Sequence, residues 1–177
     1  QLELLTTALQ ASATRAWRAE PLLAAAPAAE KRTSLEVCNP ADRRDRVGTV
    51  VEANAADVDA AMAAAAEGAR RWSRVSAPER AAVLERAADA LESQMPSLLG
   101  LIVREAGKTC ANSVGEVREA VDFLRYYAAQ ARAELVESDH APLGPVVCIS
   151  PWNFPLAIFT GQVAAALAAG NSVLAKP

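Results

Sequence analysis

The feature that most constrains this 177-residue chain is the stretch Gly144–Pro155, which reads Gly-Pro-Val-Val-Cys-Ile-Ser-Pro-Trp-Asn-Phe-Pro. Its wholly apolar run Val146–Ile149 predicts a short strand that is buried on both faces, as in a parallel sheet. The pair Ser150-Pro151 ends this strand, and Pro155 favours the start of a helix. A strand that stops just before a helix is where α/β proteins place their ligands. We therefore expect the function of the chain to depend on this loop.

The residues after the loop complete a strand–helix–strand unit. The predicted helix runs from Pro155 to about Ala169 and ends at Gly170-Asn171, and Ser172–Ala175 forms a second buried strand. Such a unit crosses over right-handed. Two parallel strands do not make a stable sheet alone. We therefore expect an α/β fold of which this chain is an N-terminal piece, truncated inside its second domain.

The residues upstream of this unit are predicted to be mainly helical. Apolar residues recur at helical spacing over 2–16, from Asn54 to Arg71, after Ser76, from Leu98, and over 112–135. Capping chemistry marks the starts of the second and third helices, and Gly107 is placed to end the fourth. The expected inner faces carry Val58, Met62, Ala65, Val83, Leu84, Val117, Val121 and Leu124. By contrast, other faces are expected to carry Glu116, Glu119 and Arg125.

Two short strands are expected ahead of these helices, at 34–38 and 47–52. The turn Asn39-Pro40-Ala-Asp42 lies between them, because proline presets φ and the flanking side chains cap locally. Before the strands, Pro21–Arg32 has two prolines and no period, which indicates a linker. We place a domain boundary near residue 33.

Composition excludes several classes of function. The net charge is −3 without a basic stripe, which argues against a nucleic-acid partner. Three cysteines without metal spacing and a single histidine, His140, argue against a disulfide framework and a zinc site. No apolar run reaches the ~18 residues of a membrane span. The plain interpretation is a soluble cytoplasmic protein, and a start at Gln1 instead of Met predicts an upstream segment.

The loop offers a hydrogen-bond donor without a nucleophile. Asn153 could donate to a developing negative charge, or it could cap the following helix; spacing alone leaves both open. Trp152 and Phe154 could line a channel or pack in a core. Lys176, at the carboxyl end of a strand, could reach a cofactor hydroxyl or phosphate, or be solvated. We expect Cys148, Cys38 and Cys110 to be structural residues whose thiols are unreactive.

No G-x-G-x-x-G follows the first strand, so a glycine loop does not predict a cofactor. However, the segments Pro142–Pro155, Ala164–Asn171 and Val173–Pro177 resemble the NAD(P)-dependent aldehyde dehydrogenase superfamily in order and spacing. Further matches upstream extend the resemblance over roughly 34–177: Asn39-Pro40, Trp72, Arg80, Glu105–Lys108 and Glu116. The sequence of the loop, together with Asp122–Tyr127, looks most like that of the 1-pyrroline-5-carboxylate dehydrogenase domain of bacterial proline utilization A.

This resemblance implies a fold and a division of the chain. The fold is the N-terminal part of an aldehyde dehydrogenase, a helical segment leading into the first βαβ of a variant Rossmann domain, which explains the missing glycine fingerprint. Residues 1–33 would be a helix and linker from a preceding domain. Residues 34–141 would be the mainly helical N-terminal part, and 142–177 the incomplete start of the NAD-binding domain.

The resemblance also implies roles for single residues. Asn153 matches the asparagine of the oxyanion hole, and Ile149, Ser150, Pro151 and Trp152 match the loop beside the nicotinamide. Lys176 matches the lysine that reaches the adenosine ribose. The substrate residues would be Phe154, in the channel, and Glu119, at the entrance, although a solvated helix face is the simpler role for Glu119.

The implied reaction is NAD-dependent oxidation of L-glutamate 5-semialdehyde to glutamate. FAD would belong only to a proline dehydrogenase domain of the parent protein. The expected partners are the aldehyde substrate, the rest of the parent and further copies in a homo-oligomer. The family's catalytic cysteine and general-base glutamate lie beyond Pro177, so the chain alone is expected to be inactive. The alternatives are another aldehyde dehydrogenase, such as a succinate-semialdehyde type, and a non-catalytic helical interaction fragment.

Overall fold

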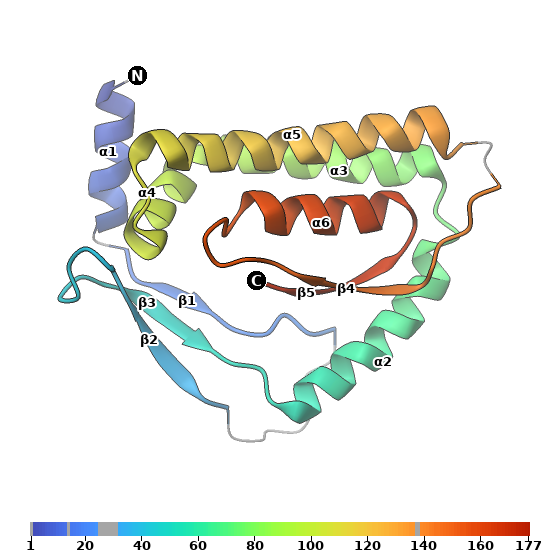
Figure 1. Ribbon diagram of the computed structural model, residues 1–177, viewed down its shortest axis with the longest axis horizontal. Helices are drawn as coiled ribbons and strands as arrows, with labels where there is room; N and C mark the ends of the chain where they lie inside the picture. Colours follow the sequence, from blue (N-terminus) through green and yellow to red (C-terminus); the bar gives the residue numbers. More distant parts are fainter. Residues whose placement is uncertain (1, 14, 25–31, 137–138) are drawn as a thin grey trace. The chain divides into compact units, whose positions relative to one another are not determined.

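The computed structural model describes residues 2–13, 15–24, 32–136 and 139–177 (Figure 1). They divide into two compact units, one within 1–61 and 94–115 and the other within 62–93 and 116–177. The predicted division of the chain at 33 and 141, with 1–33 assigned to a preceding domain of a parent protein, stays a prediction. Most of the predicted linker, 25–31, lies outside the described residues.

The first unit contains a three-stranded sheet beside helices. Its strands are β1 (Trp17–Ala19), β2 (Ser34–Cys38) and β3 (Arg46–Val51), in the order β1-β3-β2. β2 pairs antiparallel with β3, which confirms the predicted hairpin. β1 pairs parallel with β3 and was not predicted. The predicted helix over 2–16 is shorter than expected, because α1 (Leu2–Ala13) ends before this strand.

The hairpin turn has the predicted chemistry. The Asn39 side-chain oxygen accepts a hydrogen bond from the Ala41 N–H at 2.9 Å, and the Asn39 N–H donates to the Asp45 carbonyl at 2.9 Å. The helix α4 (Met95–Ala106), which contacts β2 and β3, ends at Gly107 with a left-handed φ of 63°, as predicted. Arg104 of α4 donates to both carboxylate oxygens of Asp45. It therefore joins α4 to the hairpin.

The helices α2 (Ala55–Trp72) and α5 (Cys110–Glu134) each contain residues of both units. The helix α3 (Ala77–Ser93) belongs to the second unit alone. Both predicted helix starts are confirmed. Asn54 and Asp57 exchange hydrogen bonds between side chain and backbone at 2.9 and 3.0 Å. Ser76 and Glu79 form the predicted capping box.

The second unit is layered, with α6 (Ala157–Ala168) lying between a helix layer and the two-stranded sheet of β4 (Pro145–Ile149) and β5 (Ser172–Lys176) (Figure 1). β4 and β5 are parallel, so the predicted strand–helix–strand unit is confirmed. Small side chains let the helices approach closely. A Cβ on Gly161 of α6 would lie 2.8 Å from the ring of Phe123 on α5. The core of the unit consists of Ala81, Leu84, Ala88, Val121, Leu124, Ala128, Ala131, Ala164 and Ala168.

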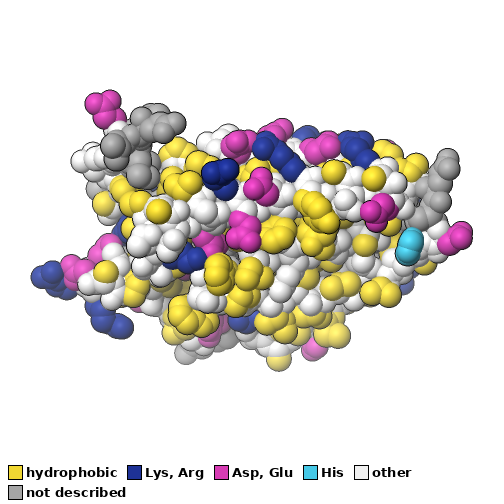
Figure 2. Space-filling view, turned by 45° about the horizontal axis from the view of Figure 1, so that its top comes forward, with side chains coloured by type: hydrophobic (Ala, Val, Ile, Leu, Met, Phe, Trp, Pro, Cys, Tyr) yellow, Lys and Arg dark blue, Asp and Glu magenta, His cyan; other side chains and the backbone are white. Residues whose placement is uncertain are grey.

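Ion pairs connect α3 and α5 on their outer side. Arg125 pairs with Asp89 and Glu92, and Arg132 pairs with Glu85. Figure 2 shows charged side chains of both signs interspersed over the visible face. No stripe of one charge forms on that face. The ion pairs between α3 and α5 are exposed, and exposed ion pairs contribute little to stability.

Four predictions of burial are wrong. Val58 and Met62 of α2 are 50% and 57% exposed, and Val83 of α3 is 36% exposed, because the apolar stripes are narrower than the 3.6-residue pattern indicates. The first strand is not buried on both faces, since Val147 is 62% exposed while Cys148 is buried. A sheet of two strands covered by α6 on one side leaves the alternate side chains of β4 uncovered.

None of the helices in the described part of the chain is long and apolar enough to span a membrane.

Candidate functional site

The predicted site lies where β4 and β5 end side by side. In the parallel register, Ile149 is opposite Lys176, the last residues of the two strands. The Ser150 N–H donates to the Lys176 carbonyl at 3.1 Å, which extends the ladder one residue into the loop. The loop therefore leaves the sheet at the carboxyl ends of its strands, the edge at which open α/β sheets bind ligands.

The loop turns sharply after leaving the sheet. The Phe154 N–H donates to the Pro151 carbonyl at 3.3 Å, the bond that closes a four-residue β-turn. Trp152 and Asn153 occupy the two corner positions of this turn. Both are exposed, Trp152 to 84%. The turn therefore presents one large aromatic ring and one carboxamide at its tip.

The helix after the turn begins later than predicted. Its N-cap residue is Leu156, which makes no side-chain capping hydrogen bond, and α6 itself begins at Ala157. The alternative that Asn153 is the N-cap is therefore wrong, since it lies three positions before the cap residue. With that role removed, the exposed Asn153 carboxamide stays consistent with a donor to a ligand.

Glu116 of α5 caps α6 from outside its own segment. The residue is 3% exposed, and its Oε2 accepts hydrogen bonds from the N–H groups of Leu156 at 3.2 Å and Ala157 at 2.9 Å. The prediction that Glu116 lies on another face of its helix is therefore wrong. A sequence signal existed, because Glu116 falls at helical spacing with Ala120 and Leu124 on the buried stripe, where an unpaired carboxylate is costly.

The other end of α6 is held by two long side chains that donate to its last carbonyl groups. The Trp72 Nε1–H donates to the Leu167 carbonyl and the Arg80 Nε–H to the Ala168 carbonyl, each at 2.9 Å. Gly170 follows with a φ of 86° and its N–H also bonds to Leu167, so the helix ends as predicted. A cationic side chain at this end complements the negative end of the helix dipole.

The predicted site residues are thus partly brought together. Ile149, Lys176 and the turn 150–154 share one edge of the second unit. Ile149 is 65% exposed and the Lys176 amine is exposed, whereas Ser150 is buried and its hydroxyl is without a hydrogen-bond partner among the described residues. Glu119 is exposed on α5, and its role at a substrate entrance stays a prediction.

This edge of the second unit carries both exposed apolar surface and a cationic side chain. Ile149 and Trp152 offer exposed apolar surface suited to a nicotinamide ring, and Lys176 offers a cation beside the adjacent strand end. The orphaned Ser150 hydroxyl is a further polar group in the same loop. These residues fit one wall of a cofactor site. A bound cofactor would need its other contacts from other residues.

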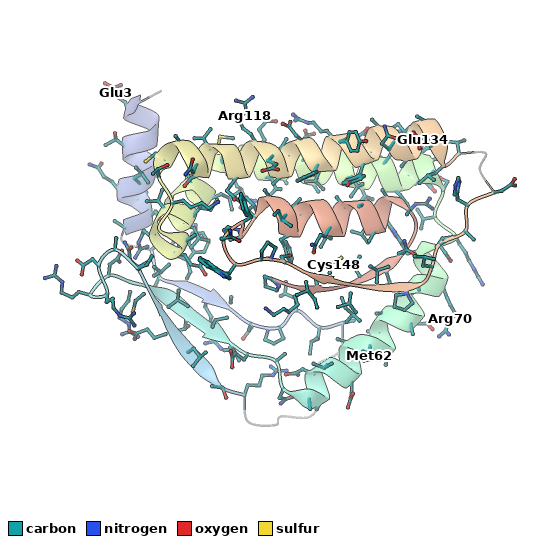
Figure 3. The ribbon with its side chains drawn as sticks, in the orientation of Figure 1. Glu3, Met62, Arg70, Arg118, Glu134 and Cys148 are labelled. Carbon is teal, nitrogen blue, oxygen red and sulfur yellow. The ribbon has the colours of Figure 1, made fainter. Side chains whose placement is uncertain are left out.

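The cysteines do not supply a nucleophile to the site. Cys148 is buried in β4 beneath α6 (Figure 3), and burial raises the pKa of its thiol. The hydrogen bond of Cys38 to the Glu36 carboxylate raises the pKa of that thiol as well. A raised thiol pKa disfavours the reactive thiolate. Among the described residues, no cluster of three or more His, Cys, Asp or Glu side chains could hold a metal ion.

Comparison with known proteins gives a consistent answer. The model of the aldehyde dehydrogenase family matches residues 27–177. The chain is 58% identical over 177 residues to the bifunctional protein PutA of Klebsiella aerogenes, which covers 100% of this chain and 13% of that protein. It is 38% identical over 151 residues to 1-pyrroline-5-carboxylate dehydrogenase of Geobacillus thermodenitrificans, which covers 78% of this chain and 29% of that relative.

The solved structures agree. A 1-pyrroline-5-carboxylate dehydrogenase from Thermus with bound NAD superposes with a TM-score of 0.88 at 31% identity, covering 99% of this chain and 37% of that one. The chain therefore spans little more than a third of that dehydrogenase and 13% of the PutA relative.

Proposed function

Because the chain belongs to the aldehyde dehydrogenase family, we propose that it forms part of an NAD-dependent enzyme that oxidises L-glutamate 5-semialdehyde, formed from 1-pyrroline-5-carboxylate, to glutamate in proline catabolism. The observation that carries this proposal is the 58% identity to a PutA protein over all 177 residues. The Thermus relative supports the cofactor, since its structure is described with bound NAD.

In the proposed reaction Asn153 is the oxyanion donor. A nucleophile that adds to the aldehyde carbonyl leaves negative charge on the carbonyl oxygen, and a carboxamide N–H fixed in advance stabilises that charge. The tip of the β-turn places Asn153 in the open, where a substrate carbonyl can approach it. The nucleophile and the general base come from the remainder of the parent protein.

The cofactor contacts of this chain lie beside Asn153. NAD, when bound, accepts the hydride. Ile149, Ser150, Pro151 and Trp152 would form the wall against its nicotinamide half, and Lys176 would bind a hydroxyl of the adenosine ribose. Phe154 would line the substrate channel. Any FAD would belong to a proline dehydrogenase domain of the parent, outside this chain.

The partners proposed for the chain are the rest of the parent dehydrogenase and further copies of it in a homo-oligomer, in the cytoplasm. The runner-up is another aldehyde dehydrogenase of the family, such as a succinate-semialdehyde type, because the loop that carries Asn153 does not specify the aldehyde. A non-catalytic helical fragment is the remaining alternative.

Substrate profiling of the parent protein tests the proposal. We expect kcat/KM for L-glutamate 5-semialdehyde to exceed that for succinate semialdehyde and betaine aldehyde by at least ~10-fold, because a site built to bind an amino acid loses paired polar contacts with the analogues. The measurement is the initial rate of NADH formation at 340 nm. An equal or higher kcat/KM for either analogue would favour the runner-up.

A further inference from the structure

Resting on the proposed function, we propose that Glu116 is a positioning residue: its carboxylate fixes the N-terminus of α6 and thereby sets the geometry of the Asn153 carboxamide toward the oxyanion. Glu116 itself is buried, and its Oε2 contacts the backbone N–H groups of Leu156 and Ala157. It acts through Phe154 and Pro155, the two residues between Asn153 and the first backbone N–H group that Glu116 binds.

The loop that carries Asn153 is tied down on both flanks. On the strand side, the Ser150 N–H bonds to the Lys176 carbonyl of the neighbouring strand. On the helix side, the anchor is the pair of hydrogen bonds from Leu156 and Ala157 to Glu116. Between these ties, the Phe154 N–H donates to the Pro151 carbonyl at 3.3 Å and closes the turn. Removing the helix-side tie therefore frees the segment that holds Asn153.

The Glu116 tie is suited to holding a helix end. The first N–H groups of an α-helix have no partner within the helix, and Leu156, the N-cap residue, supplies no side-chain cap of its own. One buried carboxylate oxygen accepts two of these orphan donors. Its negative charge also lies at the positive end of the helix dipole. A cap from a separate helix therefore replaces the local cap that this sequence lacks.

Contacts at the C-terminal end of α6 confine the effect of the Glu116 contact to the N-terminal end. Because Arg80 and Trp72 hold the last carbonyl groups of α6, the helix is fixed at both ends within the same unit. Close packing of Gly161 against the ring of Phe123 opposes rotation of the helix. Because the rest of α6 is fixed, we expect loss of the Glu116 contact to displace the N-terminus of α6 and the loop attached to it.

A double-mutant cycle in the parent protein tests this role. We expect Glu116→Ala to lower the single-turnover rate of NADH formation ~10–100-fold, since a misplacement of about 1 Å in a catalytic group can cost about 10²-fold. In an Asn153→Ala background the same substitution should cause no further loss, because its effect passes through Asn153. The Kd of NAD should change much less than the rate in all variants.

A second variant covers the case in which Glu116→Ala does not fold. Glu116→Gln keeps an oxygen that accepts both N–H groups but removes the charge, so its rate should lie between those of the wild type and Glu116→Ala. The matched control is Glu134→Ala, which removes an exposed glutamate from the same helix (Figure 3) and should leave the rate unchanged.

The outcomes separate the two proposals. A wild-type parent that does not oxidise L-glutamate 5-semialdehyde overturns the proposed function, and this role of Glu116 with it. An active parent in which the losses from the Glu116 and Asn153 variants multiply overturns the positioning role alone. A Glu116 variant that weakens NAD binding as much as it slows the reaction would also overturn the positioning role alone.

Discussion

Replacing Asn153 by alanine in the parent protein is expected to lower the rate of aldehyde oxidation about 10²–10³-fold, the usual cost of losing one oxyanion donor. The Kd of NAD should change little, because the cofactor wall is assigned to Ile149–Trp152 and Lys176. The carboxamide lies at an exposed turn tip and is not the cap of α6, so its loss removes no helix contact that the structure shows.

The measurement is kcat/KM for the aldehyde, together with the Kd of NAD from fluorescence titration. Asn112→Ala is the matched control, since Asn112 is an exposed asparagine whose side chain is assigned no role. Losses of equal size in turnover and in NAD affinity would point to a packing role for Asn153 and contradict its assignment as an oxyanion donor.

Replacing Arg104 by alanine is expected to lower the free energy of unfolding by about 3 kcal/mol, the lower end of the range for breaking a buried pair. The Arg104 side chain is 8% exposed, and that of its partner Asp45 is partly exposed. Its guanidinium also donates to the carbonyl groups of Ser12, Arg15 and Arg46. The hydrogen bonds from Arg104 are the first cause that lowers the pKa of Asp45 to about 2.

Urea unfolding of the variant against the wild type measures this effect. The matched control is Arg44→Ala, which removes an exposed arginine with a similar two-point contact to a carboxylate, that of Asp42. An exposed pair is worth about 0–1 kcal/mol, so this control should unfold almost as the wild type does. Similar losses from the two variants would show that burial of Arg104 does not set its contribution.

Local chemistry made much of the fold predictable. The capping pairs of α2 and α3, the turn after Asn39 and the glycines that end α4 and α6 act over a few residues, and each is confirmed. The strand–helix–strand order was predictable for the same reason, since apolar runs and proline positions decide it.

Contacts between distant residues account for what was missed. β1 is three residues long and forms by pairing with β3, about thirty positions away, so its own sequence carries no strand pattern. Glu116 was placed on a polar face because its partners, the backbone N–H groups of Leu156 and Ala157, lie forty residues further along the chain. Exposure of Val147 depends on which strands flank β4, which periodicity does not reveal.

The candidate site followed from the sequence by a different route. The spacing of the loop residues gave two roles for Asn153, and only the position of the Leu156 cap decided against the helix-capping role. The cofactor and substrate roles came from resemblance to a family. They stay predictions about a parent protein, to which this chain is proposed to contribute one edge of the active site.

The most direct test of the central claim is NADH formation from L-glutamate 5-semialdehyde by two purified proteins, the parent and the 177-residue chain alone. If this chain carries the oxyanion donor and one cofactor wall but neither nucleophile nor base, the parent will reduce NAD and the isolated chain will not. NAD reduction by the isolated chain, or none by the parent, would contradict the account.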